Sequence, residues 1–266
     1  FPGGTASAVA HEIKAISGLG RLCIAFLYTD MFKRTQINEG LLTAISELGI
    51  PVLDGPEMVS ADTIVMHNPS VLKFNNSLNV RFYCRNFVAV THENFFLPSL
   101  DQAIGGYAFD VDKCLQFLAK NTFAQNFYLA PISAWNRRTV EKWLEEGFRE
   151  WKTLWFDWSN ICDFDFITPV ALPRDRRGRH SRPGLEKFPA LSEMNQLFPT
   201  EAEYCGILGA DTLMLQQDTP QHWDLLAFNS MPVDAFLSRF DFFVYHTNPL
   251  WQESFGRVVA EAVAAG

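Results

Sequence analysis

Hydrophobic and polar positions follow two patterns along this chain: short continuous apolar runs, and longer segments whose apolar residues fall on one helical face. Apolar runs of strand length lie within residues 22–28, 50–54, 61–68 and 86–94. A helical pattern occupies residues 41–49 between the first two runs. Buried strands separated by helices predict an α/β protein with a mostly parallel, doubly wound sheet. In such sheets, ligands bind at the carboxyl ends of the strands.

The first residues of the chain predict a glycine turn followed by a helix. Gly3 and Gly4 form the turn, and Val9, Ile13 and Ile16 share one face of the helix that follows. Glycines at the start of a helix allow a phosphate or sugar to approach the backbone closely, because they have no Cβ atom. A simple tight turn is the alternative explanation of an isolated glycine pair.

Two more helices and a strand are predicted in the middle of the chain. The patterns indicate a helix over residues 109–125, a strand over 126–133 and a helix over 133–148 that Ser133 would cap. Residues 151–166 are crowded with aromatic side chains and have no clean period. This aromatic-rich, aperiodic sequence favours a connection between two domains, with the aromatic rings packed into the interface between the domains.

The second half of the chain again alternates strands and helices. Strands are predicted within residues 203–209, 222–228 and 241–245, with a helix within 231–240. We therefore predict two domains, residues 1–152 and 153–266. The chain starts in a loop and stops after a helix where this pattern calls for another strand, so we expect it to be part of a longer protein.

Composition narrows the class of protein. Hydrophobic residues make up 48% of the 266 positions and charged residues 20%, which is ordinary for a globular protein. The net charge of -8 argues against a nucleic-acid partner, because phosphate binding needs a basic face. The five cysteines are scattered and show no CxxC spacing, a pattern that fits reduced thiols in a cytoplasmic protein. No apolar stretch approaches the roughly 20 residues of a membrane span.

The stretch from residue 241 to 266 carries the clearest chemical signal. An apolar strand enters a loop, and a helix with a small-residue face follows. Glu253 in the loop and Glu261 in the helix can point toward one side of the helix start. Between them, the backbone N–H groups of Ser254, Phe255 and Gly256 would favour an anion. If the amides bind a phosphate and the carboxylates bind sugar hydroxyls, the ligand that fits is a nucleotide-sugar. The alternative is a capped surface helix with two solvated carboxylates.

The segment ESFGRVVAEAVAAG, residues 253–266, resembles the donor-site signature of retaining glycosyltransferases with the GT-B fold, in particular glycosyltransferase family 4. The resemblance implies two Rossmann-like domains that face each other across a cleft. It also implies that Glu253 contacts the transferred sugar and that Glu261 holds the nucleotide ribose. Gly3 and Gly4 match the glycine-rich loop that these enzymes carry near the donor phosphates.

A basic cluster is the second main signal in a chain that is acidic overall. Its members are Arg174, Arg176, Arg177, Arg179, Arg182 and Lys187. Such a loop can clamp a diphosphate, since arginine offers paired donors and lysine a point charge, although a solvated basic loop is the alternative. The resemblance assigns the clamp to Arg179 and Lys187, with Arg182 able to replace either. Arg176 and Arg177 depart from the pattern, because an apolar strand is expected there.

Two histidines follow predicted strands in the first half of the chain. The resemblance implies that His92 contacts the donor sugar near its anomeric carbon, and a hydrogen-bonded strand-end histidine is the alternative. His67 fits equally well an acceptor contact or a turn that serves Asn68. Asp163 and Asp165 have the spacing of a DxD metal-binding pair. The simpler explanation is that polar and aromatic residues alternate in this segment. We therefore expect neither a metal nor another cofactor.

The residue patterns and the resemblance together predict transfer of a sugar from a nucleotide-sugar, with UDP or GDP as the expected nucleotide, to an acceptor hydroxyl. The resemblance implies retention of configuration. The acceptor would be a glycan or a lipid-linked molecule, and the location would be the cytoplasm or the inner face of a membrane. A non-catalytic GT-B-like module in a glycan-assembly complex is the alternative. A Rossmann oxidoreductase is disfavoured, because the chain lacks GxGxxG after a strand with a ribose-binding acid at the usual distance.

Overall fold

The chain divides into two units in the computed structural model, which describes residues 4–29, 37–74, 78–97, 106–147, 150–163 and 165–266. The first unit comprises Phe1–Ile161 with Glu253–Phe255, and the second comprises Cys162–Gln252 with Gly256–Gly266. The boundary predicted between residues 152 and 153 therefore lies inside the first unit.

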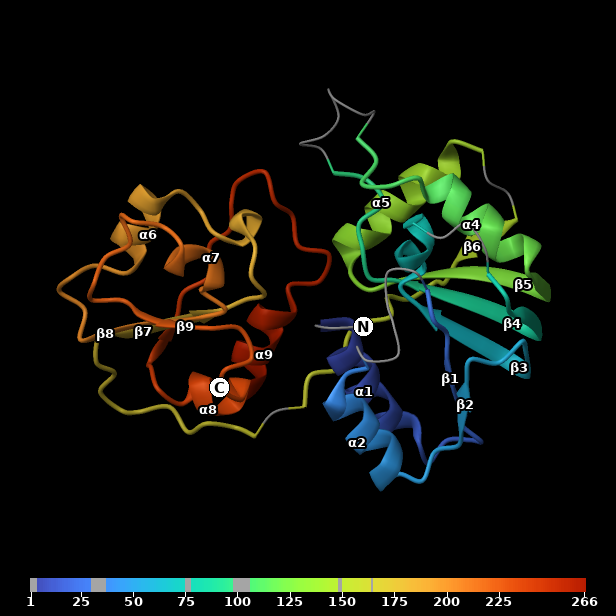
Figure 1. The fold of residues 1–266 in the computed structure, drawn as a ribbon, viewed down its shortest axis with the longest axis horizontal. Helices are drawn as coiled ribbons and strands as arrows, with labels where there is room; N and C mark the ends of the chain where they lie inside the picture. The colour runs from blue at the N-terminus through green and yellow to red at the C-terminus, as the bar shows by residue number, and fades with distance from the viewer. Residues whose placement is uncertain (1–3, 30–36, 75–77, 98–105, 148–149, 164) are drawn as a thin grey trace. The chain divides into compact units, whose positions relative to one another are not determined.

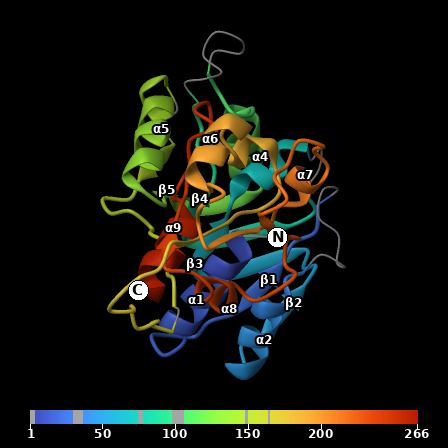
Figure 2. The same cartoon turned by 90° about the vertical axis from the view of Figure 1, so that its left-hand side faces the viewer.

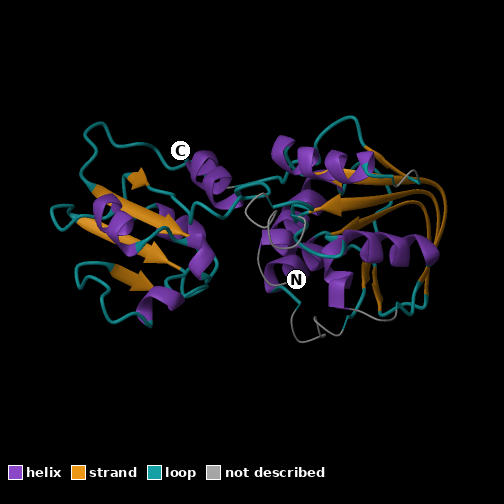
Figure 3. Ribbon diagram, turned by 90° about the horizontal axis from the view of Figure 1, so that it is seen from above, coloured by secondary structure: helices purple, strands orange, loops and turns teal. Residues whose placement is uncertain are grey.

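A four-stranded parallel sheet forms the centre of the first unit (Figures 1 and 3). Its strands lie in the order β3 (Met58–His67), β4 (Arg81–Thr91), β5 (Thr122–Pro131) and β6 (Trp151–Thr153). His67 pairs with Val90, and Thr91 pairs with Pro131, so β3, β4 and β5 end at the same edge. The residues that follow these strands are thereby brought together at one edge, where an open α/β sheet binds its ligands.

One face of this sheet is covered by α4 (Val111–Lys120), α5 (Ala134–Glu145) and the 3₁₀ helix η2 (Pro69–Phe74), whose apolar residues share one core with those of the sheet. The predicted cap of α5 is confirmed, because the hydroxyl of Ser133 accepts a hydrogen bond from the backbone N–H of Asn136 at 3.1 Å. This face is the main hydrophobic core of the unit.

Two boundaries in this region differ from the sequence predictions. The helix predicted to residue 125 ends at Lys120, because Thr122 and Phe123 pair with β4 and begin β5. Residues Trp151–Thr153, predicted as part of a connection, form β6 instead. The ring of Trp151 lies edge-on to Phe127 and is buried in the core. Tertiary pairing and ring packing therefore override the local patterns at both places.

The first and second strands form a separate pair in the same unit. Strand β1 (Ile24–Phe26) pairs in parallel with β2 (Val52–Asp54), and α1 (Gly4–Ile16) packs with α2 (Glu39–Glu47) over a small core of their own. These four elements lie together in Figures 1 and 2. The predicted parallel strands are confirmed, but the described strands of this unit make two ladders instead of one continuous sheet.

The second unit is built on another parallel sheet with the order β10, β7, β8, β9. Its strands are β7 (Arg176–His180), β8 (Tyr204–Leu208), β9 (Asp224–Leu226) and β10 (Phe242–Phe243). Its helices are η4 (Leu185–Lys187), α6 (Leu191–Leu197), α7 (Asp211–Met214), α8 (Val233–Leu237) and α9 (Arg257–Ala265). Phe198, Ile207 and Trp223 are central members of its core. The predicted α/β class with parallel strands is thus confirmed in both units.

The arginine-rich strand β7 forms although its sequence is polar. The guanidinium of Arg176 donates to both carboxylate oxygens of Asp241, at 2.8 and 2.9 Å, and Arg177 pairs in the same way with Asp175. Gly178 lies against the ring of Phe240, where an added Cβ would be 2.1 Å from the ring. The strand is therefore stabilised by ion pairing and a close ring contact in place of apolar side chains.

Candidate functional site

Two histidines meet at the carboxyl edge of the first sheet. His67 is the last residue of β3, and His92 directly follows β4. The Nδ1 atom of His67 lies 3.0 Å from the Nε2 atom of His92, which is a hydrogen-bond distance. The sequence indicated each histidine separately, and the parallel pairing of β3 with β4 brings them together. Asn68, next in the chain, adopts a left-handed conformation with φ 56°, so a turn also begins here.

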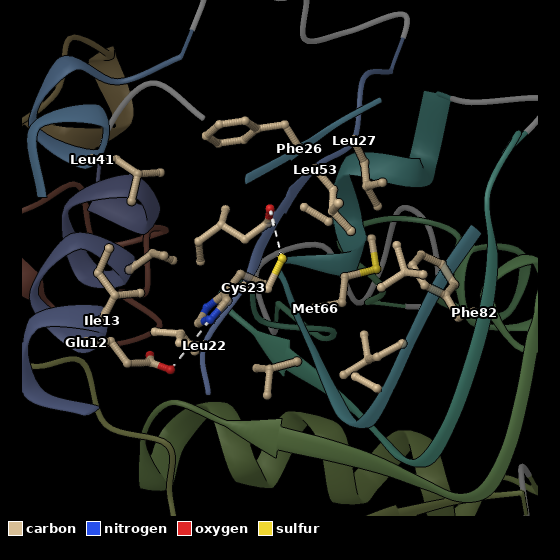
Figure 4. Close-up of a pocket in the computed structure, with 18 of the residues that line it drawn as sticks. Glu12, Ile13, Leu22, Cys23, Phe26, Leu27, Leu41, Leu53, Met66 and Phe82 are labelled. Carbon is tan, nitrogen blue, oxygen red and sulfur yellow. Dashed lines mark hydrogen bonds and ion pairs between the residues drawn. The ribbon is translucent and has the colours of Figure 1, made fainter. Parts of the chain in front are cut away.

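A buried glutamate completes this cluster from the other side. Glu12, on α1, places Oε1 at 3.7 Å from Nε2 of His67, and its Oε2 accepts a hydrogen bond of 2.9 Å from the indole N–H of Trp158. The side chains of Glu12 and His67 are only 14% and 13% exposed. Figure 4 shows the Glu12 carboxylate pointing toward an imidazole ring at the wall of a cavity.

Burial sets the ionisation of this cluster. It raises the pKa of Glu12, and the hydrogen bond from Trp158 lowers that pKa in part. Burial also lowers the pKa of His67 to about 4, so this imidazole is neutral at pH 7. Glu12 was not among the predicted site residues. A usable signal was present, because Glu12 lies one turn before Ile16 and shares the apolar face of the predicted helix.

The loop Glu253–Phe255 packs onto the same edge of the first unit. The hydroxyl of Ser254 accepts a hydrogen bond of 3.1 Å from the backbone N–H of Asn94, and its carbonyl accepts one from the hydroxyl of Ser133. Phe255 packs against an apolar cluster on β4 and β5. The two predicted sugar contacts, Glu253 and His92, thus come from segments that are hydrogen-bonded to each other through Ser254.

Asn136 fixes the backbone around His92. Its amide donates to the carbonyl of Glu93 at 3.1 Å and to the side chain of Asn94 at 3.2 Å, while its oxygen accepts from the hydroxyl of Thr91 at 2.6 Å. The residue is fully buried at the start of α5. Asn136 was not predicted as a site residue, since its role depends on partners more than 40 positions away and no local pattern marks it.

Arg179 lies in the interior of the second unit. Its side chain is 0% exposed, and it donates to the carbonyl of His246 at 2.8 Å and to that of Lys187 at 2.6 Å. The guanidinium also stacks between Phe188 and Tyr245, with its carbon 4.5 and 5.0 Å from the ring centroids. These contacts hold together the backbone of three segments, and direct contact with a diphosphate stays a prediction.

Two other predicted cations share one aromatic ring. The Nζ atom of Lys187 lies 4.5 Å from the ring centroid of Trp251, and the guanidinium carbon of Arg182 lies 5.6 Å from it. Arg182 also forms an ion pair of 2.8 Å with Glu186 and is about half exposed. The structure thus brings Arg182 and Lys187 to one place in the second unit.

Glu261 belongs to a buried polar network in the second unit. Its Oε2 lies 2.8 Å from Nε2 of His180, and its Oε1 accepts a hydrogen bond of 2.7 Å from Nε of Arg257. The Glu261 and Arg257 side chains are 9% and 10% exposed. His180 and Arg257 were not among the predicted site residues, although the spacing of four between Arg257 and Glu261 suits a helical ion pair. A ribose contact by Glu261 stays a prediction.

The remaining predicted donor residues are glycines, and the structure describes two of the three. Gly4 is the first residue of α1, and Gly3 lies outside the described residues. Gly256 caps the start of α9 with φ 73°, a conformation that glycine adopts without strain.

Within the described ranges, no group of three or more His, Cys, Asp or Glu residues is arranged to hold a metal ion. No helix in those ranges has the length and apolarity needed to cross a bilayer.

Comparison with known proteins gives a distant structural likeness. No protein-family model and no curated protein matches the chain. The crystal structure of TarM matches with a TM-score of 0.49 and 14% sequence identity. The match covers 76% of this chain and 39% of the TarM chain, so the matched residues make up well under half of the length of that protein. At this level of similarity the match decides neither family nor activity.

Proposed function

We propose that this chain takes part in retaining transfer of a sugar from a nucleotide-sugar to an acceptor hydroxyl, in the manner of a GT-B glycosyltransferase. The observation that carries the proposal is the hydrogen bond between Ser254 and the backbone of Asn94. It joins the segment that resembles a donor-site signature to the segment that carries His92. The segments that carry Glu253 and His92, which the resemblance assigns as sugar contacts, are therefore joined at one edge of the first sheet.

The first unit would supply the contacts to the sugar. In this proposal, Glu253 accepts hydrogen bonds from the hydroxyls of the transferred sugar, and His92 contacts it near the anomeric carbon. The N–H groups of Phe255 and Gly256 lie beside the start of α9, where the helix dipole favours an anion. Gly4, the first residue of α1, and Gly3 before it in the chain would allow the donor to approach the backbone closely, because glycine has no Cβ atom.

The second unit would supply positive charge for the leaving diphosphate. Arg182 and Lys187 are the proposed phosphate contacts, because both flank Trp251. Arg179 would act by holding the backbone of Lys187 in place. Glu261 would hold the ribose, with His180 and Arg257 fixing its carboxylate. Preorganised cations of this kind stabilise a departing diphosphate as its charge develops, and we propose no metal for this step.

A second candidate function is a non-catalytic module that binds a nucleotide or glycan in a glycan-assembly complex. The observation that favours it is that side chains predicted to contact the ligand form hydrogen bonds and ion pairs with other residues of the protein. Both carboxylate oxygens of Glu261 have protein partners, and the Arg179 guanidinium donates to two backbone carbonyls. Contacts of this kind also stabilise a fold without any turnover.

A thermal-shift screen with UDP, GDP, CDP and their sugars tests the proposal, followed by measurement of donor hydrolysis and transfer. A ligand that binds the folded state alone raises the melting temperature. We expect one nucleotide class to do so, and we expect Glu253→Gln to lower turnover by at least about 100-fold. Glu201→Gln, at an exposed glutamate of the second unit, is the matched control. Binding without turnover would support the module, and no binding to any nucleotide would contradict both candidates.

A further inference from the structure

We propose that Glu12 and His67 are positioning residues that fix the tautomer of His92. In this arrangement the ring proton of His92 is on Nε2, and Nδ1 is the nitrogen that accepts a hydrogen bond. The tautomer follows from the structure of the first unit alone. The use of Nδ1 to accept a hydrogen bond from a ligand hydroxyl rests on the proposed function.

The three side chains form a row, and each comes from a different element. Glu12 lies on α1, His67 ends β3, and His92 follows β4. The two nitrogens of His67 face different partners, since Nε2 lies 3.7 Å from the Glu12 carboxylate and Nδ1 lies 3.0 Å from Nε2 of His92. One neutral imidazole therefore links a carboxylate to a second imidazole.

Chemistry decides which nitrogen of His67 carries its single proton. A neutral imidazole has one N–H donor and one lone-pair acceptor. A distance of 3.7 Å is too long for a hydrogen bond, so the carboxylate acts here through its charge. That charge attracts an N–H dipole and repels a lone pair, which places the proton of His67 on Nε2. The lone pair of His67 is then on Nδ1, facing His92.

The preference is passed on to His92 by the hydrogen bond between the rings. Because Nδ1 of His67 is the acceptor, Nε2 of His92 must be the donor. A neutral His92 then carries no proton on Nδ1. That nitrogen accepts hydrogen bonds, so it suits a hydroxyl of a ligand and does not suit a carbonyl or an ether oxygen.

The surroundings strengthen the effect of the carboxylate. Glu12 and His67 line a cavity of about 430 Å³ between β1 and β3, and most of the other lining residues are aliphatic (Figure 4). Electrostatic interactions are stronger beside such apolar walls than in water. Trp158 holds the second oxygen of the carboxylate, so its charge stays next to His67.

Nitrogen-15 NMR of the intact chain, labelled at the histidine ring nitrogens and held at pH 7.5 without ligand, tests the tautomer directly. The signals of His67 and His92 are assigned by single substitutions of each histidine. We expect both rings to carry their proton on Nε2 in the unmodified protein. A proton on Nδ1 of either ring in the unmodified protein, or rapid exchange between the two tautomers there, would overturn the inference.

Glu12→Leu removes the charge, and Glu47→Leu is the matched control because Glu47 is an exposed glutamate on α2. We expect the single tautomer to be lost in Glu12→Leu and kept in Glu47→Leu. An unchanged tautomer in folded Glu12→Leu would contradict the role of Glu12. If donor turnover is found, Glu12→Leu should lower kcat about 10-fold with KM nearly unchanged. Absence of turnover would contradict the proposed function, whereas the NMR spectra would still decide the tautomer independently.

Discussion

The side-chain hydroxyl of Ser254 accepts a hydrogen bond of 3.1 Å from the backbone N–H of Asn94, although the two residues are 160 positions apart in the chain. The contact makes Glu253–Phe255 part of the first unit, while the residues on either side belong to the second. A segment from late in the chain is therefore fixed beside the carboxyl end of β4.

Ser254→Ala should loosen this loop. Loss of one hydrogen bond of this kind costs about 1 kcal/mol in the free energy of unfolding. The effect on donor turnover should be larger than the effect of a surface change, because Glu253 is the next residue. Urea denaturation and a donor hydrolysis assay measure the two quantities. Ser238→Ala is the control, since that hydroxyl also forms a hydrogen bond with the backbone but lies on the surface of the second unit. Equal activity losses in the two variants would contradict the assigned role.

Arg179→Ala should destabilise the second unit by about 3 kcal/mol or more, because it leaves a cavity and removes the donor from the buried carbonyl of Lys187 and the partly buried carbonyl of His246. Arg179→Lys should also destabilise it, since an ammonium cannot reproduce the planar fork. Denaturation followed by tryptophan fluorescence measures the change. Arg182→Ala, at a half-exposed arginine, should stay within about 0.5 kcal/mol. A variant of Arg179 that loses nucleotide affinity at unchanged stability would instead indicate direct contact with the diphosphate.

His67 should make the protein less stable in acid. Burial lowers its pKa from 6.5 to about 4, so between these values the unfolded chain binds a proton that the folded chain does not. The free energy of unfolding therefore rises with pH across this window, and about 3 kcal/mol is lost as pH falls from 6.5 to 4. Glu12, whose pKa is raised by burial, contributes a slope of opposite sign above its ordinary value of 4.5.

The contribution of His67 is measured as a difference between the protein and His67→Gln. Urea denaturation at several pH values from about 4 to 7 should give a steeper rise for the unmodified protein than for the variant. Glu12, His92 and Trp158 face His67 in both proteins, so their contributions largely cancel. Parallel curves would contradict the predicted shift of the pKa.

Glu261→Gln should destabilise the second unit by about 3 kcal/mol, because it leaves the buried Arg257 without its carboxylate. Glu203→Gln is the control, since the ion pair between Glu203 and Arg174 is largely exposed and should contribute little. Denaturation measures both. If Glu261 also holds a ribose, the variant should bind nucleoside diphosphates more weakly at temperatures where it is fully folded. Unchanged affinity would limit Glu261 to a structural role.

Several strands could be predicted in part, since the strands predicted within residues 61–68, 86–94, 126–133 and 203–209 overlap β3, β4, β5 and β8. Strand β6 could not, because Trp151 and its neighbours have no period and acquire their structure by pairing with β5. Strand β7 departs from the apolar pattern for a related reason. Its arginines are compatible with a sheet only because Asp175 and Asp241 lie beside them, and Asp241 comes from a distant part of the chain.

The candidate site was predictable where its residues follow strands. His67 and His92 both end apolar runs, which marked them as edge residues, but no local pattern indicates that their rings touch. Their contact depends on the register between β3 and β4. Asn136 could not be predicted because it acts through partners far away in the chain, whereas Glu12 could have been, because it lies on the apolar face of the predicted helix. The burial of Arg179 could not be predicted either. The local sequence is the same whether the guanidinium lies in a solvated basic loop or stacks between two aromatic rings.

Strand β3 has β4 as its one ladder partner among the described strands, while β1 pairs with β2. The boundary between β1 and β3 is therefore a seam without a main-chain ladder among the described strands, and the cavity of about 430 Å³ lies along it. Elements on one side of such a seam can shift as a body without breaking either ladder. Since α1 packs with α2 beside β1, a small slip along this seam would carry Glu12 away from His67 while both sheets stay intact.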